Sequence, residues 1–469
     1  MDAILPPKAM DAAAPASARE EFLALLRLAG PLVAANLLQM SIYASDVIFV
    51  ARLGTEALAA ATLGVYLYSV VMFALQGLVG AAAPVIAAEL GRKRHAVREV
   101  RRSFRMGLWL AVLASLPFML ALAHGRDILL LIGQDPGAAA VADDFLDILL
   151  WAMIPAIMAS VLRITIAALG RPGWAIGVAA VALAVNVAGN WLLVFGNLGF
   201  PALGLAGSAI ASVVTSVAMC LAYAVIALTD RRIRRYRLFG NWWRGEFSRL
   251  KDLVRIGVPI AVTLTFEGGL FSAAAFLVGL IGVAEVAAHA IALQIAAVAF
   301  QVPFGIAQAA TIRVGMGYGA RDRLWIARAG WVALILGTGF MGLTAFAIWL
   351  GPRLFVSAYI DVDAAENARV AALAVQYLAV AAAFQLFDGA QAVAAGVLRG
   401  LQDTRVPMIL AALGYWVFGF GAAVLLGFPL GLQGVGVWIG LAIGLLAVSV
   451  LLVWRWSRRE GLGLVPATA

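Results

Sequence analysis

Apolar segments follow one another along nearly the whole of this chain, each about twenty residues long, which is the length at which a helix crosses a bilayer. Only 13% of the residues are charged, whereas soluble globular proteins carry about 25%. These observations exclude a soluble domain. We expect an all-α polytopic membrane protein with about twelve transmembrane helices, over residues 23–51, 57–82, 104–124, 140–168, 174–196, 202–229, 253–281, 285–311, 325–350, 367–398, 406–428 and 432–456.

Lysine and arginine gather in alternate connections between these segments, at residues 91–105, 230–255, 313–323 and 455–460. The connections FGNLGFPALG and GLIGVAE contain neither residue. Because basic residues are retained on the cytoplasmic side, we expect a multi-pass membrane protein with both termini in the cytoplasm. The net charge of +9 then reflects topology and attraction to anionic headgroups, and no nucleic-acid partner is expected.

The chain contains an internal repeat. LLRLAGPLVA at residues 25–34 resembles LVRIGVPIAV at 253–262, and the same shift of 228 residues places Gly54 on Gly282 and Gly77 on Gly305. The repeat predicts two six-helix bundles of the same orientation, related by a pseudo-twofold axis along the membrane normal. Alternating-access transporters have this arrangement, with the substrate site between the halves. A duplication that only enlarged a helix bundle is the alternative.

The expected domains follow from the repeat and the basic connections. They are a cytosolic tail over residues 1–22, an N-terminal six-helix lobe over 23–229, a basic cytoplasmic linker over 230–252, a C-terminal lobe over 253–456 and a second tail over 457–469.

Three carboxylates lie well inside apolar segments: Asp46, Glu267 and Asp388. An acid at the bilayer centre costs about 2.5–3.5 kcal/mol on insertion scales, so it should face the protein interior, be protonated or hold a cation. The structural alternative is an acid neutralised by an arginine, but Arg163 and Arg399 lie nearer the segment ends. The three acids do not coincide under the repeat, which predicts two different acidic sites, with Asp46 alone in one and the other two paired.

Two asparagines accompany the first acid. Asn186 and Asn190 are four residues apart, so they share one helix face, and we expect them beside Asp46. Hydrogen bonding between helices is the alternative role. Ser208, Ser212 and Thr215 are weaker candidates. An adaptable lining of methionine and aromatic residues suits bulky cations, and the expected substrate-binding residues are Met40, Tyr43, Met72, Phe266, Phe271, Gln385, Phe387, Tyr415 and Trp416.

The stretches SDVIFVARLG, GVPIAVTLTFEGGLF, NWLLVFG and FDGAQAVAAGVLRGLQDT resemble the multidrug and toxic compound extrusion (MATE) family, in particular its bacterial NorM-type branch. The resemblance covers residues 20–456 and implies an antiporter that exports cationic, lipophilic drugs in exchange for H+ or Na+. It implies no cofactor besides the H+ or Na+ that serves as the coupling ion. From the resemblance we expect small cationic substrates, a monomer embedded in the lipid of the bacterial inner membrane, and no enzymatic activity.

The resemblance also implies roles for individual residues. Asp46, Asn186 and Asn190 match the family's acid and polar pair in the N-terminal half, whereas Glu267 and Asp388 match the cation pair of the C-terminal half, a candidate Na+ site. Phe300 corresponds to an aromatic ring that closes this site in some relatives. Phe384 stands where some relatives have a tyrosine, which weakens the case for Na+.

Functions of other classes are disfavoured. A flippase for lipids or lipid-linked sugars would require a large cationic cavity, whereas the intramembrane charges here are acidic. DDFLD at residues 143–147 fits the magnesium–diphosphate motif of prenyltransferases, but it is present once and is separate from the other acids. Duplicated lobes with dissimilar sites disfavour a channel.

Overall fold

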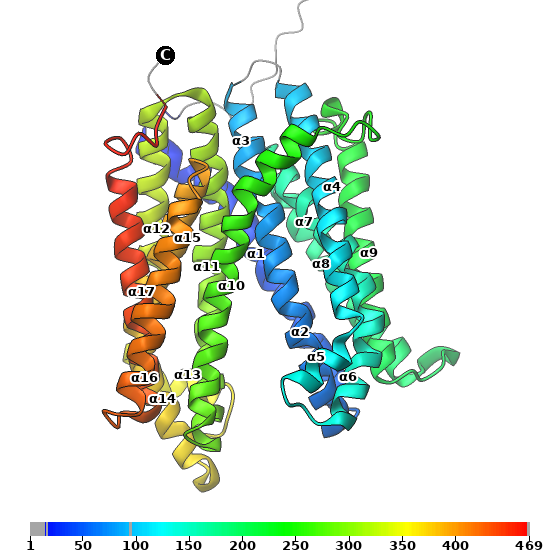
Figure 1. Ribbon diagram of the computed structural model, residues 1–469, viewed down its shortest axis with the longest axis vertical. Helices are drawn as coiled ribbons and strands as arrows, with labels where there is room; N and C mark the ends of the chain where they lie inside the picture. Colours follow the sequence, from blue (N-terminus) through cyan, green and yellow to red (C-terminus); the bar gives the residue numbers. More distant parts are fainter. Residues whose placement is uncertain (1–14, 16, 93–95, 467–469) are drawn as a thin grey trace, which may run out of the picture. The chain divides into compact units, whose positions relative to one another are not determined.

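The structure is a computed structural model that describes residues 15, 17–92 and 96–466 (Figure 1). Among these residues, 12 helices are long and apolar enough to cross a membrane, which confirms the predicted number. The first six are α1 (Ala18–Ala51), α2 (Thr55–Gly80) continued by α3 (Ala82–Arg92), α4 (Ala96–Leu122), α6 (Pro136–Leu149) continued by α7 (Met153–Ala168), α8 (Gly173–Phe195) and α9 (Leu205–Thr229).

The second six helices follow a basic connection. They are α10 (Phe247–Gly279), α11 (Val283–Ala320), α12 (Arg323–Leu350), α14 (Ala368–Gly400), the composite of α15 (Arg405–Ala412), η5 (Leu413–Phe420) and α16 (Gly421–Gly427), and α17 (Gln433–Ser457). Short helices α5 (Gly125–Leu131) and α13 (Pro352–Ser357) occupy connections.

Two helices continue well past their predicted C-terminal ends. The segments expected at residues 57–82 and 285–311 continue as helix to Arg92 and Ala320. Hydropathy locates the point where a helix leaves the hydrocarbon, but the backbone hydrogen bonds of a helix continue into a polar environment. Part of each basic connection is therefore helical.

The helix ends reproduce the internal repeat. Helix α2 begins at Thr55 and α11 at Val283, while α1 ends at Ala51 and α10 at Gly279, and both pairs are 228 residues apart. The equivalent glycines Gly54 and Gly282 are the N-cap residues of α2 and α11. The repeat therefore extends from the sequence to the bounds of the helices.

The helices pack into two compact units. The N-terminal unit comprises the described residues of 34–86 and 94–261, and the C-terminal unit comprises those of 1–33, 87–93 and 262–469. The division falls within α1 after Val33 and within α10 after Ala261, again 228 residues apart. Each unit therefore includes the beginning of a helix whose remainder belongs to the other unit. The domain bounds expected from the sequence remain a prediction.

Glycines allow the beginnings of α1 and α10 to pack closely against other helices of the units that contain them. A Cβ atom on Gly77 of α2 would lie 2.5 Å from the Cα of Ala261 in α10, and one on Gly305 of α11 would lie 2.5 Å from Cγ2 of Val33 in α1. Small residues allow helix backbones to approach in this way in membrane proteins. The two contacts are equivalent under the repeat, so the same close approach of two helices occurs once in each unit.

Candidate functional site

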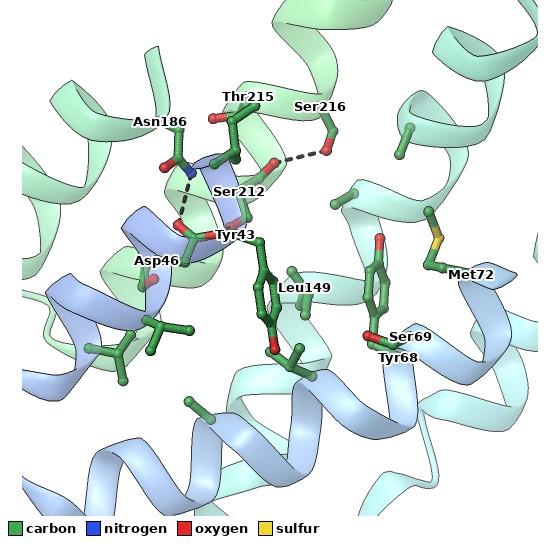
Figure 2. A pocket seen from close by; sticks show the side chains of 18 of the residues that line it. Tyr43, Asp46, Tyr68, Ser69, Met72, Leu149, Asn186, Ser212, Thr215 and Ser216 are labelled. Carbon is green, nitrogen blue, oxygen red and sulfur yellow. Dashed lines mark hydrogen bonds between the residues drawn. The ribbon is translucent and has the colours of Figure 1, made fainter. Parts of the chain in front are cut away.

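Asp46 is surrounded by hydrogen-bond donors in the N-terminal unit. Asn186 and Asn190 of α8 each donate from Nδ2 to its Oδ1 over 2.8 Å, and Ser212 Oγ of α9 donates to Oδ2 over 3.2 Å. Figure 2 shows the bond from Asn186 to Asp46. The i, i+4 spacing of the asparagines places both amides on the α8 face that meets α1. This arrangement fits an ionised carboxylate, which only accepts hydrogen bonds.

The amide oxygens of both asparagines are buried and have no hydrogen-bond partner among the described residues. An amide presents two donors on one side and an acceptor on the other. If either side chain turned over, its oxygen could accept a hydrogen bond from a protonated Asp46. The same pair can therefore stabilise both protonation states of the acid.

A cavity of about 320 Å³ opens beside Asp46 in the same unit. Drug-sized ligands occupy cavities of about 300–1,000 Å³. Of the predicted lining residues, Tyr43 and Met72 contact this cavity, as do Ser208, Ser212 and Thr215, whereas Met40 does not line it. The wall further includes Thr62, Tyr68, Ser69 and Gln76 of α2. These residues were not predicted, although the seven-residue spacing of Thr62, Ser69 and Gln76 places them on one helix face and was a usable signal.

The three predicted acids do not form ion pairs with arginines of the described residues. Arg163 instead donates to Asn36 Oδ1 over 3.1 Å and to Gln39 Oε1 over 3.5 Å. Within the described part of the chain, no lysine or arginine forms an ion pair with any of the three predicted acids. The lining of the cavity likewise contains neither basic residue, so its one charge is negative when Asp46 is ionised.

The C-terminal unit brings the other two acids together through one amide. Gln391 of α14 donates from Nε2 to Glu267 Oε1 over 2.9 Å and to Asp388 Oδ1 over 3.3 Å. Its Oε1 accepts a hydrogen bond from the Tyr415 hydroxyl over 2.8 Å. Arg399 acts on Glu267 electrostatically. The site is buried, since Asp388 and Gln391 are 4% and 2% exposed.

Local backbone geometry positions this second site. Gln391 lies three residues after Asp388, which places both on one face of α14. Tyr415 belongs to the π-helical segment η5, and such wide turns occur frequently at functional sites. Gln391 was predicted only as part of the family motif and without a role of its own, although its three-residue spacing from Asp388 was a usable signal.

The other predicted residues belong to the C-terminal unit. Phe384 is buried, edge-on to Phe271 with ring centroids 6.1 Å apart, and Phe300 stacks on Phe304 at 5.8 Å. Gln385 is buried and accepts a hydrogen bond from Thr344 over 2.6 Å. Binding roles for these residues remain predictions, as they do for Phe266, Phe387 and Trp416.

Comparison with known proteins identifies the chain's family. The MatE family model matches residues 31–192 and 259–425, one stretch in each repeat. The chain belongs to the MatE family. As a MatE protein it is a multi-pass membrane transporter and not an enzyme.

The MatE relatives include bacterial proteins of similar length. The chain is 50% identical over 442 residues to the "Probable multidrug resistance protein NorM" of Mesorhizobium japonicum, covering 94% of this chain and 95% of the relative. It is 46% identical over 438 residues to the protein of that name from Brucella suis, covering 93% of each. These similarities confirm the NorM-type branch.

Solved MatE structures share the fold. The Vibrio cholerae MATE transporter VcmN matches with a TM-score of 0.86 at 18% identity, covering 96% of this chain and 100% of that one. The eukaryotic MATE transporter AtDTX14 matches with a TM-score of 0.84 at 22% identity, with the same coverage.

Proposed function

We propose that this chain is a secondary active antiporter that exports cationic, lipophilic compounds by alternating access, in exchange for H+ or Na+. The observation that carries the proposal is the position of Asp46, at the wall of a cavity without basic lining residues and without an arginine partner. Its NorM relatives are named as probable multidrug resistance proteins, which agrees with a broad substrate range.

In this mechanism a cationic compound enters the cavity and neutralises the ionised Asp46. Asn186 and Asn190 hold the carboxylate so that an oxygen faces the compound. When H+ or Na+ reaches the acid from the outside, the negative charge that retained the compound is lost, and the compound leaves. When the coupling ion is H+, one of the two Asn amides turns over to accept the single hydrogen bond that the protonated acid donates. The empty transporter then returns inward.

The second acidic site sets the stoichiometry. Exchange of one coupling cation for one monovalent compound moves no net charge, so only the ion gradient drives export. Exchange of two coupling cations for one monovalent compound moves one net charge inward, so the membrane potential also drives export. Its contribution is about 2.3 kcal/mol per charge and 100 mV. We propose that Glu267 and Asp388 share the second cation. Na+ prefers oxygen ligands, which the two carboxylates can supply, so this pair is also the candidate Na+ site.

The test is efflux of a fluorescent cation from proteoliposomes with pH and Na+ gradients imposed separately. Efflux driven by one gradient alone identifies the coupling ion, and a current under voltage clamp identifies two cations per substrate. Absence of efflux under both gradients would contradict antiport. We further propose both termini in the cytoplasm and a monomer; a cysteine-labelling assay from each side of the membrane tests the orientation.

A further inference from the structure

The connection between α9 and α10 forms an ordered platform, defined here as residues 230–246. Its start is fixed by Asp230, whose Oδ1 accepts the backbone N–H of Arg232 over 2.9 Å and whose Oδ2 accepts Trp174 Nε1 over 3.0 Å. Arg171 adds an ion pair to Asp230 at 3.1 Å. The platform therefore begins at a fixed angle to the end of α9.

The inner side of the platform is apolar and packed. Ile233, Tyr236 and Leu238 are buried, and Phe239 meets Phe104 of α4 edge-on with centroids 5.7 Å apart. Burial of such side chains stabilises a segment by about 1.5–3 kcal/mol each. The platform is thus a part of the N-terminal unit and not a loose linker.

The end of the platform is fixed by charge. Glu246 forms ion pairs with Arg102 and with the buried Arg105, and Arg105 Nη1 also donates to the backbone oxygen of Asn241 over 3.0 Å. Both acidic residues of the platform, Asp230 and Glu246, are therefore engaged with other residues of the unit. Neither is available to neutralise arginines on the outer side.

The outer side is basic and has an aromatic edge. Six arginines of the platform are exposed: Arg231, Arg232, Arg234, Arg235, Arg237 and Arg244. Trp243 is 76% exposed, and Phe247, the first residue of α10, is 79% exposed. Because the platform directly joins two helices long and apolar enough to cross a membrane, we expect these side chains near the level where a bilayer presents its headgroups.

We infer that the outer side of the platform binds the phosphate headgroups of anionic phospholipids. Clusters of four to eight basic residues beside a membrane helix attract anionic lipid, and guanidinium groups bind phosphate in bidentate fashion. Trp243 and Phe247 suit insertion at the interface. The adjacent membrane helices favour a lipid over a soluble polyanion as the source of phosphate. This inference does not depend on the exported substrate or the coupling ion.

The test compares two purified full-length variants with the native chain in neutral detergent. One carries R231Q, R232Q, R234Q and R235Q on the platform. The matched control carries R52Q, R126Q, R405Q and R458Q, which remove the same charge from exposed arginines elsewhere. Binding of phosphatidylglycerol and of phosphatidylcholine with the same acyl chains is measured by native mass spectrometry, and the melting temperature reports folding.

We expect the native chain and the control to prefer phosphatidylglycerol, and the platform variant to lose at least about tenfold in that preference. Equal loss in both variants, or no loss in either, would overturn the inference. The inference would also be overturned if inorganic phosphate or a short oligonucleotide displaced bound phosphatidylglycerol at a lower concentration than added lipid does. If the fourfold variant fails to fold, R234Q with R235Q is measured in its place, with an expected partial loss; unchanged preference would again overturn the inference.

Discussion

Asn190 donates from its Nδ2 to Oδ1 of Asp46 over 2.8 Å, although the two residues are 144 positions apart in the chain. The contact joins α8 to α1 at the wall of the cavity. It places an amide that can either donate or accept beside the one carboxylate among the described residues that line that cavity. The properties of the proposed coupling site can therefore be tested by changing the acid and leaving its amides in place.

Asp46→Asn should preserve the fold and abolish coupled export. The substitution removes a costly intramembrane acid, but it also removes the charge that would attract both the exported compound and the coupling cation. Export of a fluorescent cation should fall to the rate of protein-free vesicles, while the melting temperature stays equal or rises. The matched control is Ser216→Ala, because Ser216 lines the same cavity and its hydroxyl bonds to the Ser212 backbone oxygen. Full export by the asparagine variant would exclude Asp46 as the coupling residue.

Gln391→Met should change the affinity of the second site for the coupling cation more than Tyr415→Phe does. The first change keeps side-chain length but removes the amide that both acids share, whereas the second removes only the hydroxyl at the far end. A hydrogen bond to a charged group is worth about 1.5–3 kcal/mol, so the apparent affinity for the coupling cation should change roughly tenfold or more. The measurement is transport rate against cation concentration. Equal effects of the two variants would contradict a site organised by Gln391.

Gly77→Ala should destabilise the N-terminal unit. The new methyl group would lie 2.5 Å from the Cα of Ala261, and overpacking of this kind costs about 1–3 kcal/mol. Gly80→Ala, in the same helix, meets no atom within 4 Å and should be neutral or stabilising by up to about 1 kcal/mol. Thermal unfolding in detergent compares the two. A higher melting temperature for the Gly77 variant would show that the crossing is looser than described.

The carboxyl of Asp230 should stabilise the protein in a pH-dependent manner. Burial alone would raise its pKa, but the hydrogen bonds from Trp174 and the Arg232 backbone and the charge of Arg171 together lower it below the ordinary 3.8. A lowered folded-state pKa means that the stabilisation is complete above about pH 4 and is lost as the pH falls through the folded pKa.

Asp230→Asn should therefore lower the melting temperature at pH 7 by an amount that shrinks as the pH falls below about 4. Melting curves of both proteins across pH 2–7 measure the difference, since the range spans the ordinary carboxyl pKa. A difference that stays constant across this range would show that the charge of Asp230 contributes nothing.

The sequence by itself predicted the twelve membrane helices, the repeat, and Asp46, Glu267 and Asp388 as exceptional residues. The number of helices is confirmed because the bilayer imposes a length and an apolar composition on every crossing segment. A charged residue inside such a segment is conspicuous for the same reason, and the roles of the three acids stay predictions. The i, i+4 rule likewise placed Asn186 and Asn190 on one face of a helix. Such properties are local, and a local pattern encodes them.

The tertiary structure decided which residues meet. Asp46 contacts donors more than 130 positions away, Gln391 joins two acids from different helices, and the beginnings of α1 and α10 pack in separate units from the helices' remainders. Tyr415 reaches Gln391 from a π-helical segment. Apolar periodicity marks the buried face of a helix but not its neighbour, because many partners satisfy the same hydrophobic requirement and only close packing selects one.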